Sequence, residues 1–325
     1  MNKPKILVVG SLVMDNIVST EVFPNSGQSI IGTDFRKAPG GKGANQAVQA
    51  ARLGADVTMF GKAGKDNDGD VLLDTCKASG VDVSPVIRDG ATHTGCAAVL
   101  LEEKPGESTK NRIIIVPGAN MLITPKEIEG IKARISEFDM VMLQLEIPME
   151  INCLIARCAS EAGVPVMLNP APSAPLPPEL LPYLTYISPN EHEAADLTGI
   201  SIAHDGHEAN MDDVRNAAKK LMDMGVKNVL ITLGSAGAVL FEGGKEYSSP
   251  CAKGITAVDP TAAGDSFIGA FCYGTCRGWA KEDVLTFANH TAALTVSAMG
   301  AMPSLPEKAA VDALLEKAGH ASCVK

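Results

Sequence analysis

The sequence predicts an α/β protein in which a mostly parallel sheet is covered by helices on both faces. Short β-rich runs, the first at residues 6–10, alternate with longer helical patterns along most of the chain, and this alternation is typical of βαβ units. Glycines at the ends of helical patterns, such as Gly54 and Gly80, act as stop signals. Hydrophobic residues make up 46% of the 325 residues, which is enough for a sizeable core.

The predicted elements follow one another in a regular order. After residues 6–10, strands are expected at residues 57–60, 140–143, 165–168, 186–188, 229–232 and 238–241. Helices are expected at residues 44–53, 68–79, 125–137, 149–162, 190–198 and 211–224, and the chain is almost entirely helical from Gly264 to about Leu315. We expect one domain over residues 1–325, because the alternation resumes after the proline-rich stretch 170–182.

Two segments interrupt this alternation. Residues 12–38 have the pattern of two extended runs around a turn at residues 24–27, and residues 92–116 have that of paired strands joined by a polar stretch. Neither segment is followed by a crossover helix, so we expect a small β-sheet that projects from the main domain. Such a sheet is either a structural extension or a lid over an active site.

The composition excludes several functional classes. The 28 basic and 38 acidic residues give a formal net charge of −10, which argues against binding to nucleic acid or to an anionic membrane. No apolar run is long enough to span a membrane, and the first one is too short for a signal peptide. The eight cysteines form no C-x-x-C pair and no zinc-site spacing. We therefore expect a soluble, cytoplasmic protein.

The first chemical motif is the glycine-rich segment at residues 39–46, PGGKGANQ, which enters a predicted helix. Three glycines in four residues allow a ligand to approach the backbone closely, and amides at a helix N-terminus attract polar or anionic groups. Lys42 and Asn45 can bind hydroxyl groups. The segment is neither a Walker A loop nor a GxGxxG fingerprint, and a simple turn is the alternative.

The second motif, AVDPTAAGDSF at residues 257–267, places Asp265 at the start of a helix. An acid in the first turn is also explained by the helix dipole alone. However, the preceding small residues can form an anion-binding nest of amides. A carboxylate beside an anion site suits phosphoryl transfer, in which the carboxylate accepts a hydroxyl proton and the amides stabilise the phosphoryl charge.

Three further segments lie where predicted strands end. In SPNEHE at residues 188–193, Asn190 and Glu193 form either a plain capping box or a site that organises magnesium through water. The segment ITLGSAGA at residues 231–238 is either an ordinary hairpin or a nucleotide contact. Glu146 follows the strand at residues 140–143, where a parallel sheet presents ligand groups.

In their order and spacing, six motifs resemble those of the ribokinase-like (PfkB) carbohydrate kinase family, from Ile6 to about Pro306. They are GGKGANQA at residues 40–47, NPAP at 169–172, PNEHE at 189–193, TLGS at 232–235, AAGD at 262–265 and GAMPS at 300–304. The resemblance implies a three-layer α/β/α fold with a β-sheet lid that often forms a dimer interface. It also implies ATP-dependent phosphorylation of the 5-hydroxyl of a pentose, by default D-ribose, with Mg²⁺ and an activating K⁺.

The resemblance further implies a role for each matching residue. Asp265 is the expected catalytic base, and Ala263 and Gly264 are the expected anion-hole amides. The expected sugar-binding residues are Asp15, Gly41, Lys42, Asn45 and Glu146. The expected nucleotide-binding residues are Asn190, Thr232, Gly234, Ser235, Gly237, Gly264 and Asn289. Glu193 is expected to order Mg²⁺ through water, and the expected monovalent-cation residues are Asp259, Thr261, Gly300 and Ser304.

Two residues depart from the pattern of the family. Val13 replaces an asparagine that is a hydroxyl partner for ribose, and valine leaves a buried hydroxyl unpaired at a cost of about 1–3 kcal/mol. A 2-deoxyribose kinase is therefore an alternative, whereas an aromatic content of 4% argues against a nucleoside. Pro260 removes an amide and a hydroxyl next to the expected potassium site. The alternative without catalysis is an inactive sugar sensor. The presence of Asp265, Asn190 and Glu193 argues against this alternative.

Overall fold

A nine-stranded sheet in the order β17-β16-β15-β12-β11-β10-β1-β4-β6 forms the centre of the protein. The computed structural model describes residues 3–104, 110–206 and 208–320. The strands from β15 to β6 run parallel, and β16 and β17 add an antiparallel edge. They are β1 (Lys5–Val9), β4 (Asp56–Phe60), β6 (Val81–Asp82), β10 (Met140–Leu143), β11 (Val166–Leu168), β12 (Tyr186–Ile187), β15 (Asn228–Thr232), β16 (Ala238–Glu242) and β17 (Lys245–Ser249).

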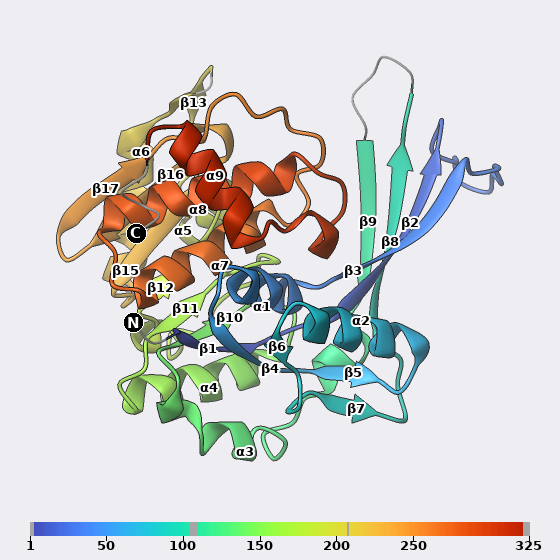
Figure 1. Ribbon diagram of the computed structural model, residues 1–325, viewed down its shortest axis with the longest axis horizontal. Helices are drawn as coiled ribbons and strands as arrows, with labels where there is room; N and C mark the ends of the chain where they lie inside the picture. Colours follow the sequence, from blue (N-terminus) through green and yellow to red (C-terminus); the bar gives the residue numbers. More distant parts are fainter. Residues whose placement is uncertain (1–2, 105–109, 207, 321–325) are drawn as a thin grey trace.

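Helices cover both faces of this sheet (Figure 1). The alternation of side chains along β1 shows why: Ile6 and Val8 pack into one core, whereas Leu7 and Val9 pack into the other. One layer holds α1 (Lys42–Arg52), α2 (Asn67–Ala78), α7 (Ala263–Cys276), α8 (Lys281–Val296) and α9 (Lys308–Lys317). The other holds α3 (Glu129–Lys132), α4 (Met149–Glu161), α5 (Glu191–Thr198) and α6 (Met211–Asp223). The predicted three-layer α/β/α fold is confirmed.

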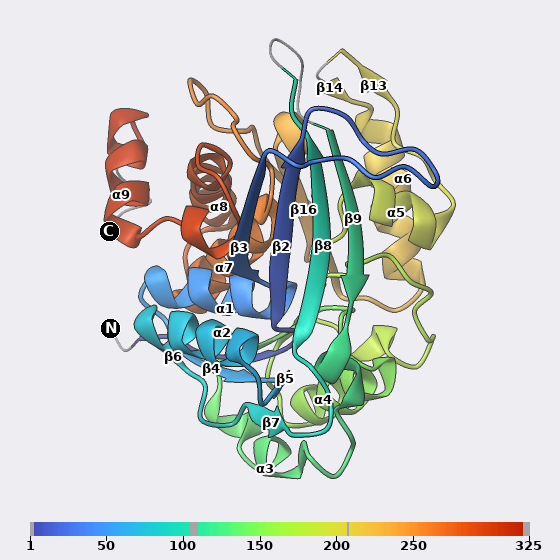
Figure 2. The same cartoon turned by 90° about the vertical axis from the view of Figure 1, so that its right-hand side faces the viewer.

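A second sheet, with the order β3-β2-β8-β9, projects from the main body (Figures 1 and 2). Its strands are β2 (Val13–Thr20), β3 (Asp34–Gly40), β8 (Gly95–Glu102) and β9 (Lys110–Val116). They come from the two segments that interrupt the sequence pattern, so the predicted projecting sheet is confirmed. Part of the polar stretch between β8 and β9, residues 105–109, lies outside the described residues.

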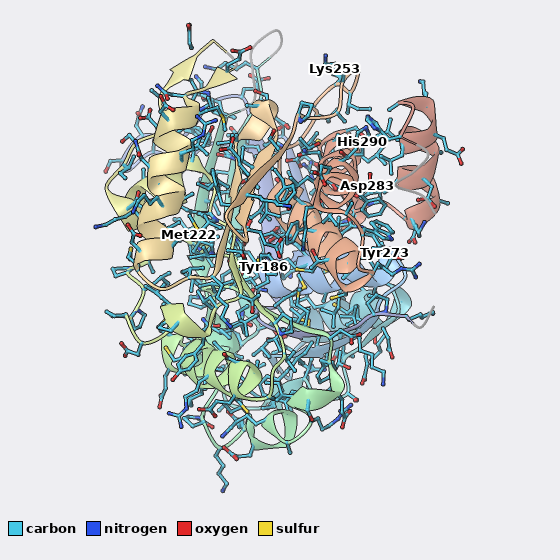
Figure 3. All side chains as sticks on the ribbon, turned by 90° about the vertical axis from the view of Figure 1, so that its left-hand side faces the viewer. Tyr186, Met222, Lys253, Tyr273, Asp283 and His290 are labelled. Atoms are coloured by element: carbon cyan, nitrogen blue, oxygen red, sulfur yellow. The ribbon has the colours of Figure 1, made fainter. Side chains whose placement is uncertain are left out.

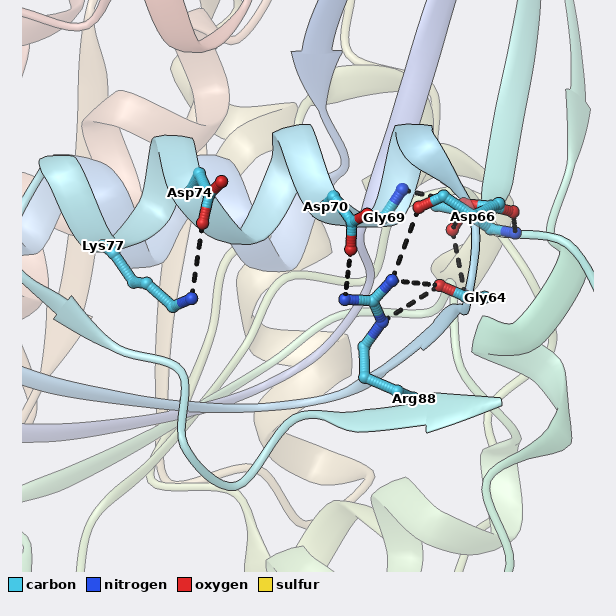
Figure 4. A network of polar contacts seen from close by, with 8 residues as sticks. Gly64, Asp66, Gly69, Asp70, Asp74, Lys77 and Arg88 are labelled. Carbon is cyan, nitrogen blue, oxygen red and sulfur yellow. Dashed lines mark hydrogen bonds and ion pairs between the residues drawn. The ribbon is translucent and has the colours of Figure 1, made fainter. Parts of the chain in front are cut away.

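A polar network fixes the base of this projecting sheet (Figure 4). Arg88 Nε and Nη2 donate to Gly64 O at 3.0 and 2.8 Å, and Arg88 Nη1 lies 2.7 Å from an Asp70 oxygen. Asp66 caps α2 by accepting from the Gly69 amide and also accepts from the Thr94 amide at 2.7 Å. Because Thr94 immediately precedes β8, these bonds join the start of that strand to α2. The strands of this region are β5 (Lys62–Gly64) and β7 (Ile87–Asp89).

Aromatic packing holds α7 against α8 and the central sheet. Tyr186 contacts Phe271 edge-to-face at 5.4 Å between ring centroids, and Trp279 contacts Tyr273 at 5.6 Å and Phe287 at 5.1 Å. Figure 3 shows Tyr186 and Tyr273 in this part of the core. The rigid packing of α7 matters because its N-terminus carries Asp265.

The single helix predicted for residues 125–137 is wrong. The structure has only α3, followed by a 3₁₀ turn at Ile135–Glu137. Ile128, Ile131 and Ile135 are buried, but Gly130 lowers the helical preference of the segment. The remaining short elements are Gly118–Leu122, Leu181–Tyr183, Gly234–Ala236 and Met302–Ser304 in 3₁₀ conformation and the pair β13 (His204–Asp205) and β14 (Glu208–Ala209). Over the described ranges, the helices are too short or too polar to cross a bilayer.

Candidate active site

The turn that opens α7 leaves a helix N-terminus without a side-chain cap. Ala262 adopts the left-handed conformation with φ 61°, and no side chain caps the helix. The Ala263 amide is used within the turn, since it donates to Pro260 O at 3.2 Å. The Gly264 and Asp265 amides have no acceptor among the described residues, so both are left to attract an anion.

The carboxylate of Asp265 follows directly and is only 6% exposed. Its two oxygens accept hydrogen bonds from adjacent residues of α1: Oδ2 from Asn45 Nδ2 at 2.8 Å and Oδ1 from Gln46 Nε2 at 3.0 Å. Each carboxylate oxygen therefore has an amide donor from α1, and the two bonds fix the orientation of the side chain.

Two cavities meet at Asp265 and Lys42, which line both. The larger, of about 1030 Å³, lies between the projecting sheet and the main body. The smaller, of about 210 Å³, lies at the N-terminus of α7. A carboxylate at this junction can contact a hydroxyl in the larger cavity while a phosphate occupies the smaller one.

The larger cavity collects the residues expected to bind sugar: Asp15, Gly41, Lys42, Asn45 and Glu146. Glu146 Oε2 accepts from the Lys42 amide at 3.0 Å and from the Ser11 hydroxyl. Gly41 has φ 93°, and a Cβ there would lie 2.7 Å from the Val13 amide nitrogen, so the loop approaches β2 too closely for a side chain.

Charges crowd this cavity and shift pKa values. Burial raises the pKa of Asp15 to about 6, with further contributions from Glu146, Asp259 and Asp265. For Lys42, burial lowers the pKa, but Asp265, Glu146 and Glu193 outweigh burial and raise it above its ordinary value. The ammonium group therefore stays charged between the two cavities.

The projecting sheet supplies an apolar wall to the larger cavity. Val13, which is 4% exposed, lines it together with Ile17, Ala97 and Val99. None of these four side chains can hydrogen-bond a ligand hydroxyl, so the polar contacts that the projecting sheet offers come from other residues, such as Asp15 and Arg36.

In the smaller cavity, Asn190 and Glu193 form a capping box at the start of α5. The Asn190 amide donates to Glu193 Oε2 at 2.9 Å, and the Glu193 amide donates to Asn190 Oδ1 at 2.8 Å. The capping-box alternative is therefore confirmed, yet both residues also line the cavity, as does Thr232. Burial raises the pKa of Glu193 despite the hydrogen bond from Asn190.

The remaining residues expected to bind nucleotide lie outside the lining of these two cavities. Asn289 has a structural role, since Nδ2 donates to Ser249 O at 2.9 Å and Pro250 O at 3.2 Å. Gly237 has φ 98°, and a Cβ there would collide with Ser249 O. Gly234 and Ser235 form the 3₁₀ turn between β15 and β16.

Three of the four residues expected at a monovalent-cation site lie together. Asp259 Oδ1 accepts from the Thr261 amide at 2.9 Å and its hydroxyl at 2.6 Å, and Oδ2 accepts from the Gly300 amide at 2.8 Å. Burial raises the pKa of Asp259, but these bonds outweigh burial and lower it, so an ionised carboxylate is held there. Ser304 lies apart, with its hydroxyl donating to Ala301 O at 2.8 Å.

The charge and oxygen chemistry at Asp259 fit a monovalent cation, and the Ser304 hydroxyl keeps its oxygen lone pairs while it donates to Ala301 O. For a divalent ion, the described ranges contain no group of three or more His, Cys, Asp or Glu side chains that could hold a metal. Mg²⁺ retains water and commonly takes phosphate ligands. Glu193, at the smaller cavity, suits such a water-mediated contact.

Sequence reasoning assigned no chemistry to Gln46, Asn169 or Ser11. Gln46 and Asn169 stand inside the quoted motifs, which was the available signal, but only the structure shows that Gln46 contacts Asp265 and Asn169. Ser11 donates to Glu146 and accepts from the Gly43 amide at 3.2 Å. It therefore orders the glycine-rich loop.

A buried carboxylate between a hydroxyl-binding cavity and an anion-binding helix N-terminus is the arrangement of a small-molecule kinase. The chain belongs to the pfkB family of carbohydrate kinases, whose sequence model matches residues 3–308.

Comparisons with individual proteins agree with this family. The ribokinase of Schizosaccharomyces pombe is 39% identical over 314 residues, which cover 94% of this chain and 96% of that protein. A deoxyribokinase of Salmonella typhi is 31% identical, covering 93% of this chain and 95% of that protein. The structure of Arabidopsis thaliana ribokinase complexed with ribose and ATP has a TM-score of 0.89 and 35% identity, covering 97% of this chain and 99% of that one.

Proposed function

We propose that the protein transfers the γ-phosphoryl group of ATP to the 5-hydroxyl of D-ribose. The observation that carries this proposal is the position of Asp265, which lines both cavities and accepts hydrogen bonds on both carboxylate oxygens. The full-length similarity to ribokinases, one of them solved with ribose and ATP, supports the choice of substrates.

In the proposed reaction, Asp265 accepts the proton of the 5-hydroxyl as the sugar oxygen bonds to the γ-phosphorus. The bond between the γ-phosphorus and the β–γ bridging oxygen breaks, and ADP leaves. The Lys42 ammonium and the Gly264 amide stabilise negative charge on the transferred group, and the Ala263 amide would join them only by leaving Pro260. Bound Mg²⁺ would neutralise phosphate charge.

Nucleotide binding is proposed at the smaller cavity and the turns beside it. Asn190, Thr232 and Gly264 line that cavity, which supports phosphate contacts, and Glu193 would hold Mg²⁺ through water. Gly234, Ser235, Gly237 and Asn289 would bind the rest of the nucleotide. The K⁺ site would use Asp259, Thr261, Gly300 and Ser304, whose hydroxyl oxygen can bind a cation while it donates to Ala301 O. Activity in KCl compared with NaCl tests this site.

The sugar would be held by Asp15, Gly41, Lys42, Asn45 and Glu146. Val13 favours a second candidate substrate, 2-deoxy-D-ribose, because its buried side chain offers no partner to a hydroxyl. The similarity to a deoxyribokinase supports this candidate.

The projecting sheet, built from residues 12–38 and 92–116 within a single domain, is proposed to act as a lid and as the interface of a homodimer. Its strand β9 exposes four successive apolar residues, Ile113, Ile114, Ile115 and Val116, each at least 43% exposed. Exposed apolar patches of this kind mark association surfaces. Use of ATP suits the cytoplasmic location that the sequence predicts.

The test is ADP release with Mg-ATP and K⁺, with D-ribose and 2-deoxy-D-ribose compared at equal concentrations. A kcat/KM ratio at least tenfold in favour of ribose, about 1.4 kcal/mol, supports the first proposal. A ratio in favour of deoxyribose supports the second. Sugar binding without ADP release from either sugar would contradict both and indicate a sensor.

A further inference from the structure

We propose that Gln46 is a positioning residue that keeps Asp265 oriented for proton abstraction, and that Gln144 fixes the orientation of Gln46. This inference rests on the proposed function, because it assigns a task to contacts of the proposed base. Neither glutamine lines either cavity, so an effect on catalysis passes through a residue that does, and Gln46 contacts two such residues, Asp265 and Asn169.

Every polar atom of the Gln46 side chain has a partner. Nε2 donates to Asp265 Oδ1 at 3.0 Å and to Asn169 Oδ1 at 3.2 Å, while Oε1 accepts from Gln144 Nε2 at 2.7 Å. Gln46 and Gln144 are both fully buried, so water does not replace a lost partner easily.

These partners allow only one orientation of the Gln46 amide. A flipped amide would place Oε1 against the oxygens of Asp265 and Asn169, and its NH₂ group against the donor of Gln144. Asn169 is itself oriented, because its Nδ2 donates to Ser188 O at 3.2 Å. The network therefore selects the orientation that donates a hydrogen bond to the carboxylate.

The outer end of the network is anchored in the second helical layer. Asn152 of α4 donates from Nδ2 to Gln144 O at 2.9 Å, which fixes the chain just after β10. Gly10 makes room for the Gln144 side chain, because a Cβ at that position would collide with Oε1. The contacts run from α4, past the end of β10, to α1 and then to Asp265.

The donated bond matters because Asp265 is buried, so few groups can fix its position. Asn45 donates to one of its carboxylate oxygens and Gln46 to the other, and these two bonds together set the orientation of the carboxylate. The charged and titratable groups around Asp265 are Lys42 on α1, Asp15 on β2, Glu146 after β10, Glu193 on α5 and Asp259 before α7.

The test compares Gln46→Met with Gln49→Met. Gln49 is a matched control, because it is an equally buried amide on α1 that donates to Pro306 O rather than to Asp265. For Gln46→Met we expect kcat to fall about 10- to 100-fold, with sugar KM changing much less. Gln49→Met should leave both kcat and sugar KM within about twofold.

A double-mutant cycle tests the role of Gln144. Gln144→Met should lower kcat in the otherwise wild-type enzyme but have little further effect in the Gln46→Met background, because it acts through Gln46. Equal losses in both backgrounds would overturn this part of the proposal. For Gln46, an unchanged kcat, or a loss of activity that lies in sugar KM rather than in kcat, would overturn the positioning role. Asp265→Asn distinguishes failure of the positioning role from failure of the proposed function. If the proposed function is wrong, this variant remains active.

Discussion

Asn45 Nδ2 lies 2.8 Å from Asp265 Oδ2, although 220 residues separate the two in sequence. The contact depends on the close packing of α1 against α7. Gly269 of α7 permits this packing, since a Cβ there would lie 3.0 Å from Gln49 Cβ and 3.1 Å from Gln46 O. A glycine one turn beyond Asp265 thus sets how closely the proposed base approaches its donors.

Gly269→Val should therefore lower both stability and activity. Overpacking of this contact should cost about 1–3 kcal/mol of unfolding free energy, and kcat should fall about tenfold or more as α7 moves from α1. Urea unfolding and ADP release measure the two effects. Gly130→Val, on an exposed surface with no atom within 4 Å of the new Cβ, should leave kcat unchanged. Full activity of Gly269→Val would show that the spacing is not critical.

Asp265→Asn should reduce kcat by about 10²- to 10⁴-fold, which is the usual contribution of a general base. Sugar binding, measured by calorimetry, should change much less, because the amide keeps the shape of the side chain. Asp74→Asn, at an exposed carboxylate on α2 that pairs with Lys77, is the control and should retain activity. Near-normal turnover of Asp265→Asn would contradict the assigned role.

Asp15 should make the fold less stable as the pH rises. Its pKa is raised to about 6 in the folded protein from an ordinary value of 3.8, so the folded state favours the protonated form. Ionisation therefore destabilises the fold as the pH rises from about 4 to about 6, and the loss is complete above that range.

We expect Asp15→Asn to raise the unfolding free energy at pH 7.5 by about 1–3 kcal/mol and to change it little at pH 4. The same substitution should weaken sugar binding. Asp56→Asn, at an exposed carboxylate of β4, should show no such dependence on pH in urea unfolding. A loss of stability in Asp15→Asn at pH 7.5 would refute the assignment.

Val13→Asn should shift the enzyme towards ribose. The new amide supplies a hydroxyl partner on the apolar wall, so the ratio of kcat/KM for ribose to that for 2-deoxyribose should rise about 5- to 150-fold. Ile17→Asn places the same amide four residues further along β2, on the same face of the sheet. That control should leave the ratio unchanged, and an equal change in both variants would argue against a specific role for position 13.

Much of the site could be anticipated from local sequence. Asp265, Lys42 and Asn45 stand in small-residue motifs whose chemistry suggested hydroxyl and phosphate binding, and all three line the proposed sugar cavity. Asn289 and Ser304 differ from these three residues, because their side chains donate hydrogen bonds to the backbone carbonyls of Ser249 and Ala301. Such bonds depend on where the loops lie in the folded protein, and a residue pattern does not show that position.

The sequence alone determined the α/β class, the buried parallel strands and the projecting sheet, because burial imposes a period on side chains that is visible in one dimension. Only the tertiary structure decided that Gln46 and Gln144 support Asp265, and that Lys42 stands between two cavities. These contacts join residues 98 and 219 positions apart. They arise from the packing of helices across the sheet, where the available volume fixes which polar groups meet.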